Sequence, residues 1–220
     1  MNLSVEKTVL YSCGAVLFTA IFGLFFYSNI SNTGISALIT GYVSKNLDLT
    51  MALYKSMGMP EENVRIISDS REQIEYVLAR IIPALSVVAT IFVVWSNLII
   101  AKPILRQKEL FYPDFGKLNQ WRAPEYLVWA VIGSGLSLLV PDRAIKMIGV
   151  NSLMVLTPVY FLQGIAIVSY FLAKKKIPLL LKVFLFSLIA PQQLFLLMVI
   201  AMGFFDMWMN FRKLNKNNSS

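Results

Sequence analysis

Residues 9–30 read VLYSCGAVLFTAIFGLFFYSNI, an uninterrupted run without a charged side chain. An α-helix rises about 1.5 Å per residue, so roughly 20 apolar residues cross the hydrocarbon core of a bilayer. Four more apolar blocks follow along the chain, at residues 81–101, 125–140, 149–173 and 178–205. Hydrophobic residues make up 57% of the 220-residue chain and charged residues only 15%, and the mean hydropathy is +0.65. The sequence therefore predicts an all-α, polytopic membrane helix bundle.

Two features of the composition limit the chemistry of this protein. The chain contains no histidine, which removes the usual general base, the imidazole of a catalytic triad and the commonest metal ligand. Its single cysteine, Cys13, lies inside the first apolar block and can form neither an intramolecular disulfide nor a thiolate metal cluster. The sequence also lacks a glycine-rich phosphate loop and any strand pattern of useful length. We therefore expect a protein that is not an enzyme, with no catalytic residues, no metal site and no cofactor.

The net charge of +8 raises the question of a nucleic-acid partner. The basic residues, however, gather beside the apolar blocks. The three clusters are Lys102, Arg106 and Lys108; Lys174, Lys175 and Lys176; and Arg212, Lys213 and Lys216. This placement is typical of residues that flank membrane spans and face anionic headgroups. It predicts the lipid bilayer, and not nucleic acid, as their partner. The last residues, 214–220, are predicted to form a disordered tail.

The first apolar block is predicted to remain in the protein as a membrane anchor. Its run from Val9 to Tyr27 is longer than the apolar region of a signal peptide, and no small-residue cleavage pattern follows it. Ala15, Thr19 and Gly23 recur every four residues and form a stripe of small residues for helix packing. Packing against another helix of the same chain is the favoured explanation, and contact with another subunit is the alternative.

Residues 31–80 are more polar but keep a helical pattern. Apolar residues recur with helical spacing over residues 35–57, which predicts an amphipathic helix. Gly58 and Pro60 should end this helix. A second helical pattern then leads directly into the next apolar block. The segment is predicted to form an amphipathic helical hairpin between the first two spans, standing off the membrane or lying on its surface.

Residues 81–213 are predicted to form a bundle of four or five further membrane segments, and the whole chain, residues 1–220, to form a single membrane domain. The number depends on the last apolar block, because Pro191, Gln192 and Gln193 interrupt it at bilayer depth. One kinked helix there makes five membrane segments in all, and a re-entrant turn makes six. The basic residues favour six, since a re-entrant turn returns the C-terminal basic cluster to the side that holds the other two.

A distinctive string, GFFDMWMNFRK, closes the last apolar block at residues 203–213. Asp206 is a carboxylate at the end of a span, where an unpaired charge is costly, so we expect a cationic or hydrogen-bond-donating partner. Arg212 lies about 120° round the axis from Asp206, so it should not be that partner if the helix is regular. Arg122, at another membrane boundary, is the predicted partner in a structural ion pair. The alternative is a proton, cation or substrate contact at Asp206.

Four amides complete the set of polar candidates inside the apolar blocks. Asn151 and Gln163 lie in the fourth block, and Gln192 and Gln193 lie in the fifth. Together with Asp206 they form the predicted ligand-binding set, because a small-molecule pocket is mostly apolar with a few convergent polar groups. Hydrogen bonds between helices explain the same amides equally well.

Several of these strings resemble a bacterial integral-membrane family, domain of unknown function 2232. The residues that carry the resemblance are Pro83, Asn97, Trp121, Pro124, Asn151, the run from Phe161 to Gly164, Gly203, Asp206, Trp208 and Arg212. It covers residues 81–213, and its most specific part is the closing string. The family is grouped distantly with the substrate-binding components of energy-coupling-factor vitamin transporters and with rod-shape membrane proteins. That grouping implies a bundle of about six helices and small-molecule capture, by analogy of fold. The Ala-x-x-x-Ala pair with which those transporter components dock their partner has no clear counterpart here.

Two functions fit these features. In the first, the protein is a small-molecule-binding or transport component that holds a ligand among the polar candidates, and the resemblance favours this function. In the second, it is a non-catalytic membrane scaffold, in which the amides lock helices together and the amphipathic hairpin recruits a partner. Both place a multi-pass protein in the cell membrane, the bacterial inner membrane, with another membrane protein or a second copy as the candidate partner. Convergence of the polar residues on a cavity, as against their use in helix contacts, distinguishes the two.

Overall fold

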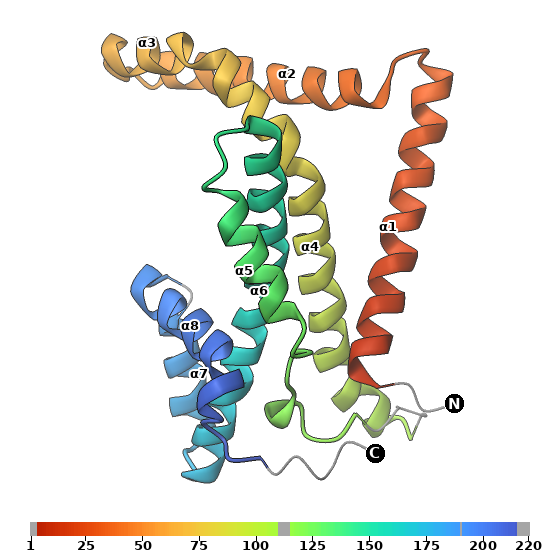
Figure 1. Cartoon of the computed structure of the whole chain (residues 1–220), viewed down its shortest axis with the longest axis vertical. Coiled ribbons are helices and arrows are strands. Elements are labelled where there is room, and N and C mark those ends of the chain that lie inside the picture. Colours follow the sequence, from red (N-terminus) through yellow and green to blue (C-terminus); the bar gives the residue numbers. More distant parts are fainter. Residues whose placement is uncertain (1–3, 110–114, 190, 215–220) are drawn as a thin grey trace. The chain divides into compact units, whose positions relative to one another are not determined.

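The structure is a computed structural model of the chain, and it describes residues 4–109, 115–189 and 191–214. Within these ranges the chain forms eight α-helices and one short 3-10 turn, with no strand (Figure 1). The elements are α1 (Val5–Ile30), α2 (Ile35–Ser56), α3 (Glu61–Asp69), α4 (Arg71–Gln107), η1 (Leu118–Gln120), α5 (Leu127–Ser137), α6 (Arg143–Lys174), α7 (Leu179–Ile189) and α8 (Gln193–Met209). The all-helical prediction is confirmed for these residues, and the predicted tail at 214–220 lies outside them except for its first residue.

Three of the helices are long and apolar enough to cross a membrane: α1, α4 and α6. Helices α7 and α8 pass the same test only when they are taken together, and they are bent by 101° at the break between them. Helix α5 is apolar but has 11 residues, about 16 Å of helix, so it reaches roughly half-way through a hydrocarbon core. By length and composition the described residues thus hold three spans, or four if the bent pair counts as one.

The ends of the helices differ from the ends of the apolar blocks. Helix α4 runs from Arg71 through Pro83 without a break, so the boundary predicted at residue 80 falls inside a helix. Helix α6 begins at Arg143, before the predicted start at residue 149. Asp142 starts it, because the Asp142 carboxylate accepts a hydrogen bond from the backbone N–H of Ile145 at 2.9 Å. Capping chemistry therefore extends α6 beyond its apolar residues.

The described chain divides into two compact units, Leu10–Thr90 and Ile91–Ser220 together with Met1–Val9. In the first of these, α2 and α3 form a hairpin that runs crosswise to α1 and to the first half of α4 (Figure 1). Gly58 lies between α2 and α3 with φ at 69°, a left-handed conformation that glycine adopts without strain.

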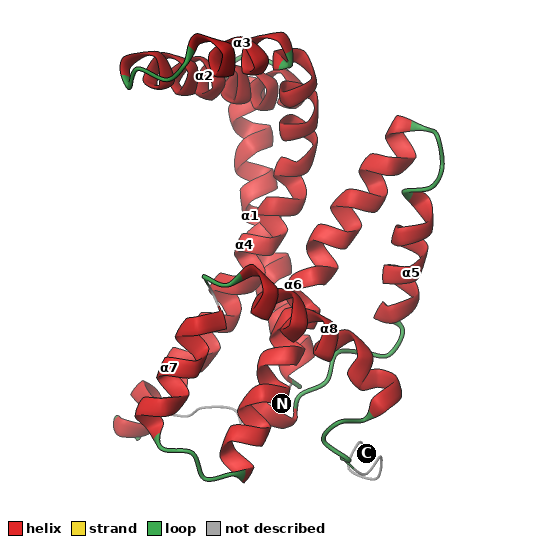
Figure 2. Cartoon of the chain, turned by 90° about the vertical axis from the view of Figure 1, so that its left-hand side faces the viewer, coloured by secondary structure: helices red, strands yellow, loops and turns green. Residues whose placement is uncertain are grey.

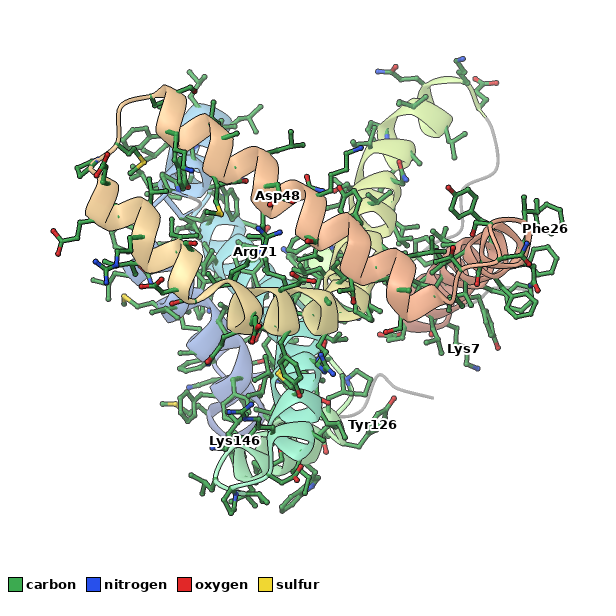
Figure 3. The ribbon with its side chains drawn as sticks, turned by 90° about the horizontal axis from the view of Figure 1, so that it is seen from above. Lys7, Phe26, Asp48, Arg71, Tyr126 and Lys146 are labelled. Atoms are coloured by element: carbon green, nitrogen blue, oxygen red, sulfur yellow. The ribbon has the colours of Figure 1, made fainter. Side chains whose placement is uncertain are left out.

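An ion pair ties the start of α4 to α2. The Arg71 guanidinium lies 2.6 Å from the Asp48 carboxylate and donates a hydrogen bond to the Ser44 hydroxyl at 3.0 Å (Figure 3). The hydrogen bond from Arg71 lowers the pKa of Asp48. Both side chains are partly exposed to solvent, so this pair orients the hairpin more than it stabilises the fold.

The stripe of small residues on α1 is exposed. Ala15, Thr19 and Gly23 all lie on the surface, and a Cβ at Gly23 would meet no atom within 4 Å. The Thr19 hydroxyl donates to the Ala15 carbonyl oxygen of its own helix at 2.9 Å. Within its own unit the stripe therefore makes no close helix contact, and its role in helix packing stays a prediction.

Helix α6 is the centre of the larger unit. Helix α5 lies beside it and is joined to it by a short turn (Figure 2), and α8 packs against its second half. The backbones approach so closely that glycine is required at both contacts. A Cβ at Gly149 would overlap the Ser137 side chain of α5, and a Cβ at Gly203 of α8 would overlap the Tyr160 carbonyl oxygen of α6. These contacts place the end of α8 against α6, where the candidate site lies.

Candidate functional site

The candidate site is a cluster of buried polar side chains around Asp206, which is 0% exposed. We call Asp206, Arg122, Arg212, Gln163 and Asn210 the Asp206 cluster. Its geometry depends on the way in which α8 ends. The helix stops at Met209, and Asn210 follows with φ at 41°, in the left-handed region that asparagine tolerates better than most residues. The chain reverses there, and the backbone N–H of Phe211 donates to Asp206 Oδ1 at 3.0 Å.

Arg212 is the nearest cation to Asp206, and its exclusion as a partner is wrong. Its Nη2 lies 2.9 Å from Asp206 Oδ2, and both side chains are 0% exposed. The exclusion assumes a regular helix to residue 212, but the left-handed turn at Asn210 brings Arg212 back to Asp206. The second guanidinium nitrogen of Arg212, Nη1, donates to the carbonyl oxygens of Asn119 and Trp121, each at 2.9 Å.

Burial lowers the pKa of Arg212, and the adjacent Asp206 carboxylate opposes that shift. Arginine remains protonated over the whole physiological pH range, so Arg212 keeps its positive charge in the buried pair. The hydrogen bonds to two backbone carbonyls satisfy donors that the single carboxylate cannot reach. Such additional bonds are what a buried ion pair needs to offset its desolvation.

Arg122, the predicted partner, takes a second position beside the same carboxylate. Its Nε lies 3.5 Å from Asp206 Oδ2, and its Nη2 donates a hydrogen bond to Asn210 Oδ1. The Arg122 side chain is 29% exposed, whereas Arg212 is fully buried. Two guanidinium groups therefore share one buried carboxylate, which leaves an excess of positive charge in the cluster. Arg122 Nε and Arg212 Nε are both buried and form no hydrogen bond among the described residues.

Gln163 connects α6 to the cluster and to the segment that precedes α5. Its Oε1 accepts from the backbone N–H of Ala123 at 3.1 Å, and its Nε2 donates to Asp206 Oδ2 at 3.4 Å. Both ends of the amide are used, and the side chain is 4% exposed. Gln163 is thus part of a contact between chain segments.

The segment whose carbonyl oxygens accept hydrogen bonds from Arg212 also contacts α1 and α4 through Trp121. Trp121 Nε1 donates to Glu6 Oε1 at 2.9 Å, and the Trp121 ring meets the Trp95 ring edge-on, with centroids 4.9 Å apart. Glu6 lies at the beginning of α1 and Trp95 in the second half of α4. Residues 119–123, which we call the 119–123 segment, therefore contact the ends of α1 and α8 together with α4 and α6.

The remaining polar candidates do not reach the Asp206 cluster. Asn151 Nδ2 donates to the Met147 carbonyl oxygen of its own helix at 2.8 Å, and Asn151 Oδ1 is buried with no partner among the described residues. Gln192 and Gln193 are exposed at the start of α8. Of the five predicted ligand-binding residues, the structure brings together only Gln163 and Asp206. The described residues contain no group of His, Cys, Asp or Glu that could hold a metal ion.

Sequence reasoning missed three residues of this site. Arg212 and Asn210 were hidden by the assumption of a regular helix, although asparagine after an apolar helix is a signal for a left-handed end. Tyr160 carries no motif, yet it is 4% exposed and its Oη is buried without a hydrogen-bond partner in the described chain. A lone tyrosine inside an apolar block offers no pattern that reveals this.

Two hollows lie next to the cluster, and Tyr160 lines both of them. The first, the polar hollow, has a volume of about 20 Å³, and Arg122, Glu125 and Gln163 are among its lining residues. That volume holds about one water molecule. The second, the apolar groove, has a volume of about 250 Å³ and lies between α5, α6 and α8. Its lining residues are Val131, Leu153, Leu156, Thr157, Tyr160, Leu197, Ile200, Ala201, Phe204 and Phe205.

The chain matches the model of a known protein family. The model of the family described as "Predicted membrane protein (DUF2232)" matches residues 1–207 of the chain. The matched region includes the first span and the α2–α3 hairpin as well as Gln163 and Asp206. No curated protein and no solved structure matches the chain.

Proposed function

Because the chain belongs to the DUF2232 family of predicted membrane proteins, we propose a non-enzymatic function within the membrane. The protein is a multi-pass scaffold of the bacterial inner membrane, and its α2–α3 hairpin binds a segment of a partner protein. The observation that carries this proposal is the groove between α2 and α3, which has a volume of about 690 Å³. A second copy of the chain is the simplest alternative partner.

The groove has the composition of a surface that receives apolar side chains. Met51 of α2, Met59 of the connecting turn and Val64 of α3 supply its apolar lining, with Lys55 and Glu61 among the polar residues around them. Methionine side chains are flexible and adapt to partners of irregular shape. Exposed apolar residues continue beyond the groove on both helices; they include Leu49, Leu53, Met57 and Ile66. An apolar helix of a partner protein fits this surface.

The Asp206 cluster supports a scaffold because Gln163 and Asp206 at its centre are used in contacts between chain segments. Gln163 uses both ends of its amide, and Asp206 accepts from Phe211, Gln163 and Arg212. The polar hollow beside them holds about 20 Å³, far below the few hundred Å³ that a small-molecule site requires. By this criterion the amides lock helices together.

A small-molecule-binding component of a transporter is the second candidate. The distant grouping of the family with energy-coupling-factor components supports it, and so do two buried donors that form no hydrogen bond in the described chain, Arg122 Nε and Tyr160 Oη. Native mass spectrometry of the purified protein separates the candidates, since a transport component should retain a water-soluble small molecule. Retention of such a molecule would favour transport over the scaffold.

The scaffold is tested by crosslinking in cells. A photoreactive residue placed at Met59 should give one discrete protein adduct, whereas the same residue at Phe22, an exposed position of α1, should react with lipid. A Val64→Glu or Met51→Glu change beside it should reduce the adduct about tenfold, because a charge enters an apolar contact. The adduct mass identifies a partner protein or a second copy. A folded protein that gives no protein adduct at Met59 contradicts the scaffold.

The same proposal includes six membrane segments, with α7 and α8 as a re-entrant pair. The 119–123 segment supports this arrangement, because Trp121 bonds to Glu6 near the N-terminus and to Arg212 after α8. This contact supports an arrangement in which the two ends of the described chain lie at the same side of the membrane. All three basic clusters then share that side, as the positive-inside rule requires.

This topology is tested with single cysteines in a Cys13→Ser background. A cysteine at Lys175 and a cysteine at Lys213 should be labelled by a membrane-impermeant thiol reagent from the same side of sealed vesicles. The expected side is the cytoplasmic one, because it holds the basic clusters. Labelling of the two positions from opposite sides rules out the re-entrant pair.

A further inference from the structure

Two hydrogen-bond donors beside the Asp206 cluster lack acceptors. Within the described residues, Tyr160 is 4% exposed and its Oη has no hydrogen-bond partner, and Arg122 Nε is buried without a hydrogen bond, although it lies 3.5 Å from Asp206 Oδ2. A buried polar group without a partner is rare in native proteins, and it indicates a bound group that fills the site. Tyr160 and Arg122 line the same polar hollow, so one bound atom could serve both donors.

The charge of the cluster indicates an anion. Arg122 and Arg212 carry two positive charges against the single carboxylate of Asp206. Glu125 is the acidic residue among those lining the polar hollow, and it is exposed, where water screens its charge. The hollow has room for about one atom of the size of an oxygen. An anionic oxygen whose parent molecule lies outside the hollow meets these limits.

The parent molecule has an apolar part, because the apolar groove begins at the same tyrosine. Tyr160 lines both hollows. The groove is open along its length, since Thr157, Leu197, Ala201 and Phe205 are exposed. Apart from Tyr160, the hydroxyl group in the lining of the groove is that of Thr157. The Thr157 hydroxyl donates to the Leu153 carbonyl oxygen of its own helix at 2.7 Å. The groove therefore offers only apolar contact along the faces of α6 and α8.

We infer that this composite site binds one anionic phospholipid, with an acyl chain in the apolar groove and a phosphate oxygen between Arg122 Nε and Tyr160 Oη. The acyl chain gains little over the surrounding bilayer, since lipid tails are as apolar as the groove. Selectivity comes from the headgroup oxygen, which meets two donors in a site of excess positive charge. A zwitterionic phospholipid brings its own cation to the same place and binds more weakly.

The test is native mass spectrometry with phosphatidylglycerol and phosphatidylcholine that carry identical acyl chains. The unmodified protein should retain one phosphatidylglycerol in preference to phosphatidylcholine. Tyr160→Phe removes only the hydroxyl and should weaken that retention about tenfold, as expected for one hydrogen bond to a charged group. Ala201→Phe should fill the apolar groove and weaken retention of both lipids. Thr157→Val, in the same groove but already bonded within α6, is the matched control and should retain phosphatidylglycerol normally.

Two further measurements keep the inference falsifiable. Tyr160→Phe should unfold at the same temperature as the unmodified protein in detergent without lipid, because its hydroxyl has no partner there. Glycerol phosphate, which has the anionic oxygen without the chain, should not displace the lipid at equal concentration. If Tyr160→Phe and Ala201→Phe fold and retain phosphatidylglycerol as the unmodified protein does, the hollow holds water alone and the inference is wrong. The α2–α3 groove takes no part in this experiment, so either proposal can fail without the other.

Discussion

Replacing Asp206 with alanine is expected to lower the free energy of unfolding by about 3–5 kcal/mol, the loss typical of removing one partner from a buried ion pair. The change leaves the guanidinium of Arg212 at 0% exposure without its counter-ion. It also removes the acceptor of the Phe211 N–H and of Gln163 Nε2. Denaturant unfolding in micelles, followed by tryptophan fluorescence, measures the loss, because Trp121 lies in the segment that Arg212 holds.

The matched control for this change is Asp48→Ala. Asp48 also pairs with an arginine, but its side chain is 59% exposed, and an exposed pair contributes little to stability. In a double-mutant cycle, Asp206→Asn combined with Arg212→Gln should lose less than the sum of the two single changes, because the double variant no longer holds the fully buried Arg212 charge without a counter-ion. Equal effects at Asp206 and Asp48 would contradict a buried ionic cluster.

The second large effect is expected at Gly203. A Cβ there overlaps the Tyr160 carbonyl oxygen of α6, and a backbone atom cannot move aside as a flexible side chain can. Gly203→Ala should therefore reach the upper end of the 1–3 kcal/mol typical of overpacking, and Gly203→Leu should exceed it. The readout is the same unfolding measurement, together with the yield of folded protein.

Gly133→Ala is the matched control for Gly203. It lies inside α5, where a Cβ would meet no atom within 4 Å. Alanine has a higher helix propensity than glycine, so this change should be neutral or should stabilise the protein by up to about 1 kcal/mol. If Gly203→Ala behaves in the same way, α6 and α8 do not approach as closely as the structure indicates.

The helices were predictable because apolar runs and their breakers are local properties. Gly58 ends α2 as expected, since its left-handed φ of 69° depends only on its own backbone. The length of α5 was less predictable. Its apolar block covers residues 125–140, but the helix covers only Leu127–Ser137, and apolar content alone does not separate helix from turn.

The partners of Asp206 were only partly predictable, because they depend on tertiary structure. Arg122 lies 3.5 Å from the carboxylate. It was predicted as the partner because it lies at another membrane boundary in the sequence. Arg212 is closer, at 2.9 Å, and one residue decides this: Asn210 turns the chain out of the helix. Gln192 and Gln193 are exposed at the 101° bend between α7 and α8. The sequence predicts a break at this place, but it does not predict the direction in which the chain bends.

The bonds from Arg212 to the 119–123 segment also set an order of events during synthesis. Asn119 and Arg212 are separated by 93 positions, and ribosomes add roughly 5–20 residues each second. The segment around Asn119 therefore leaves the ribosome roughly 5 to 20 s before the arginine that holds it. During this interval α5, α6, α7 and α8 are synthesised, and Arg122 has no carboxylate beside it until Asp206 follows. The contact between Arg212 and the 119–123 segment therefore forms only after all the helices of the described chain have been synthesised.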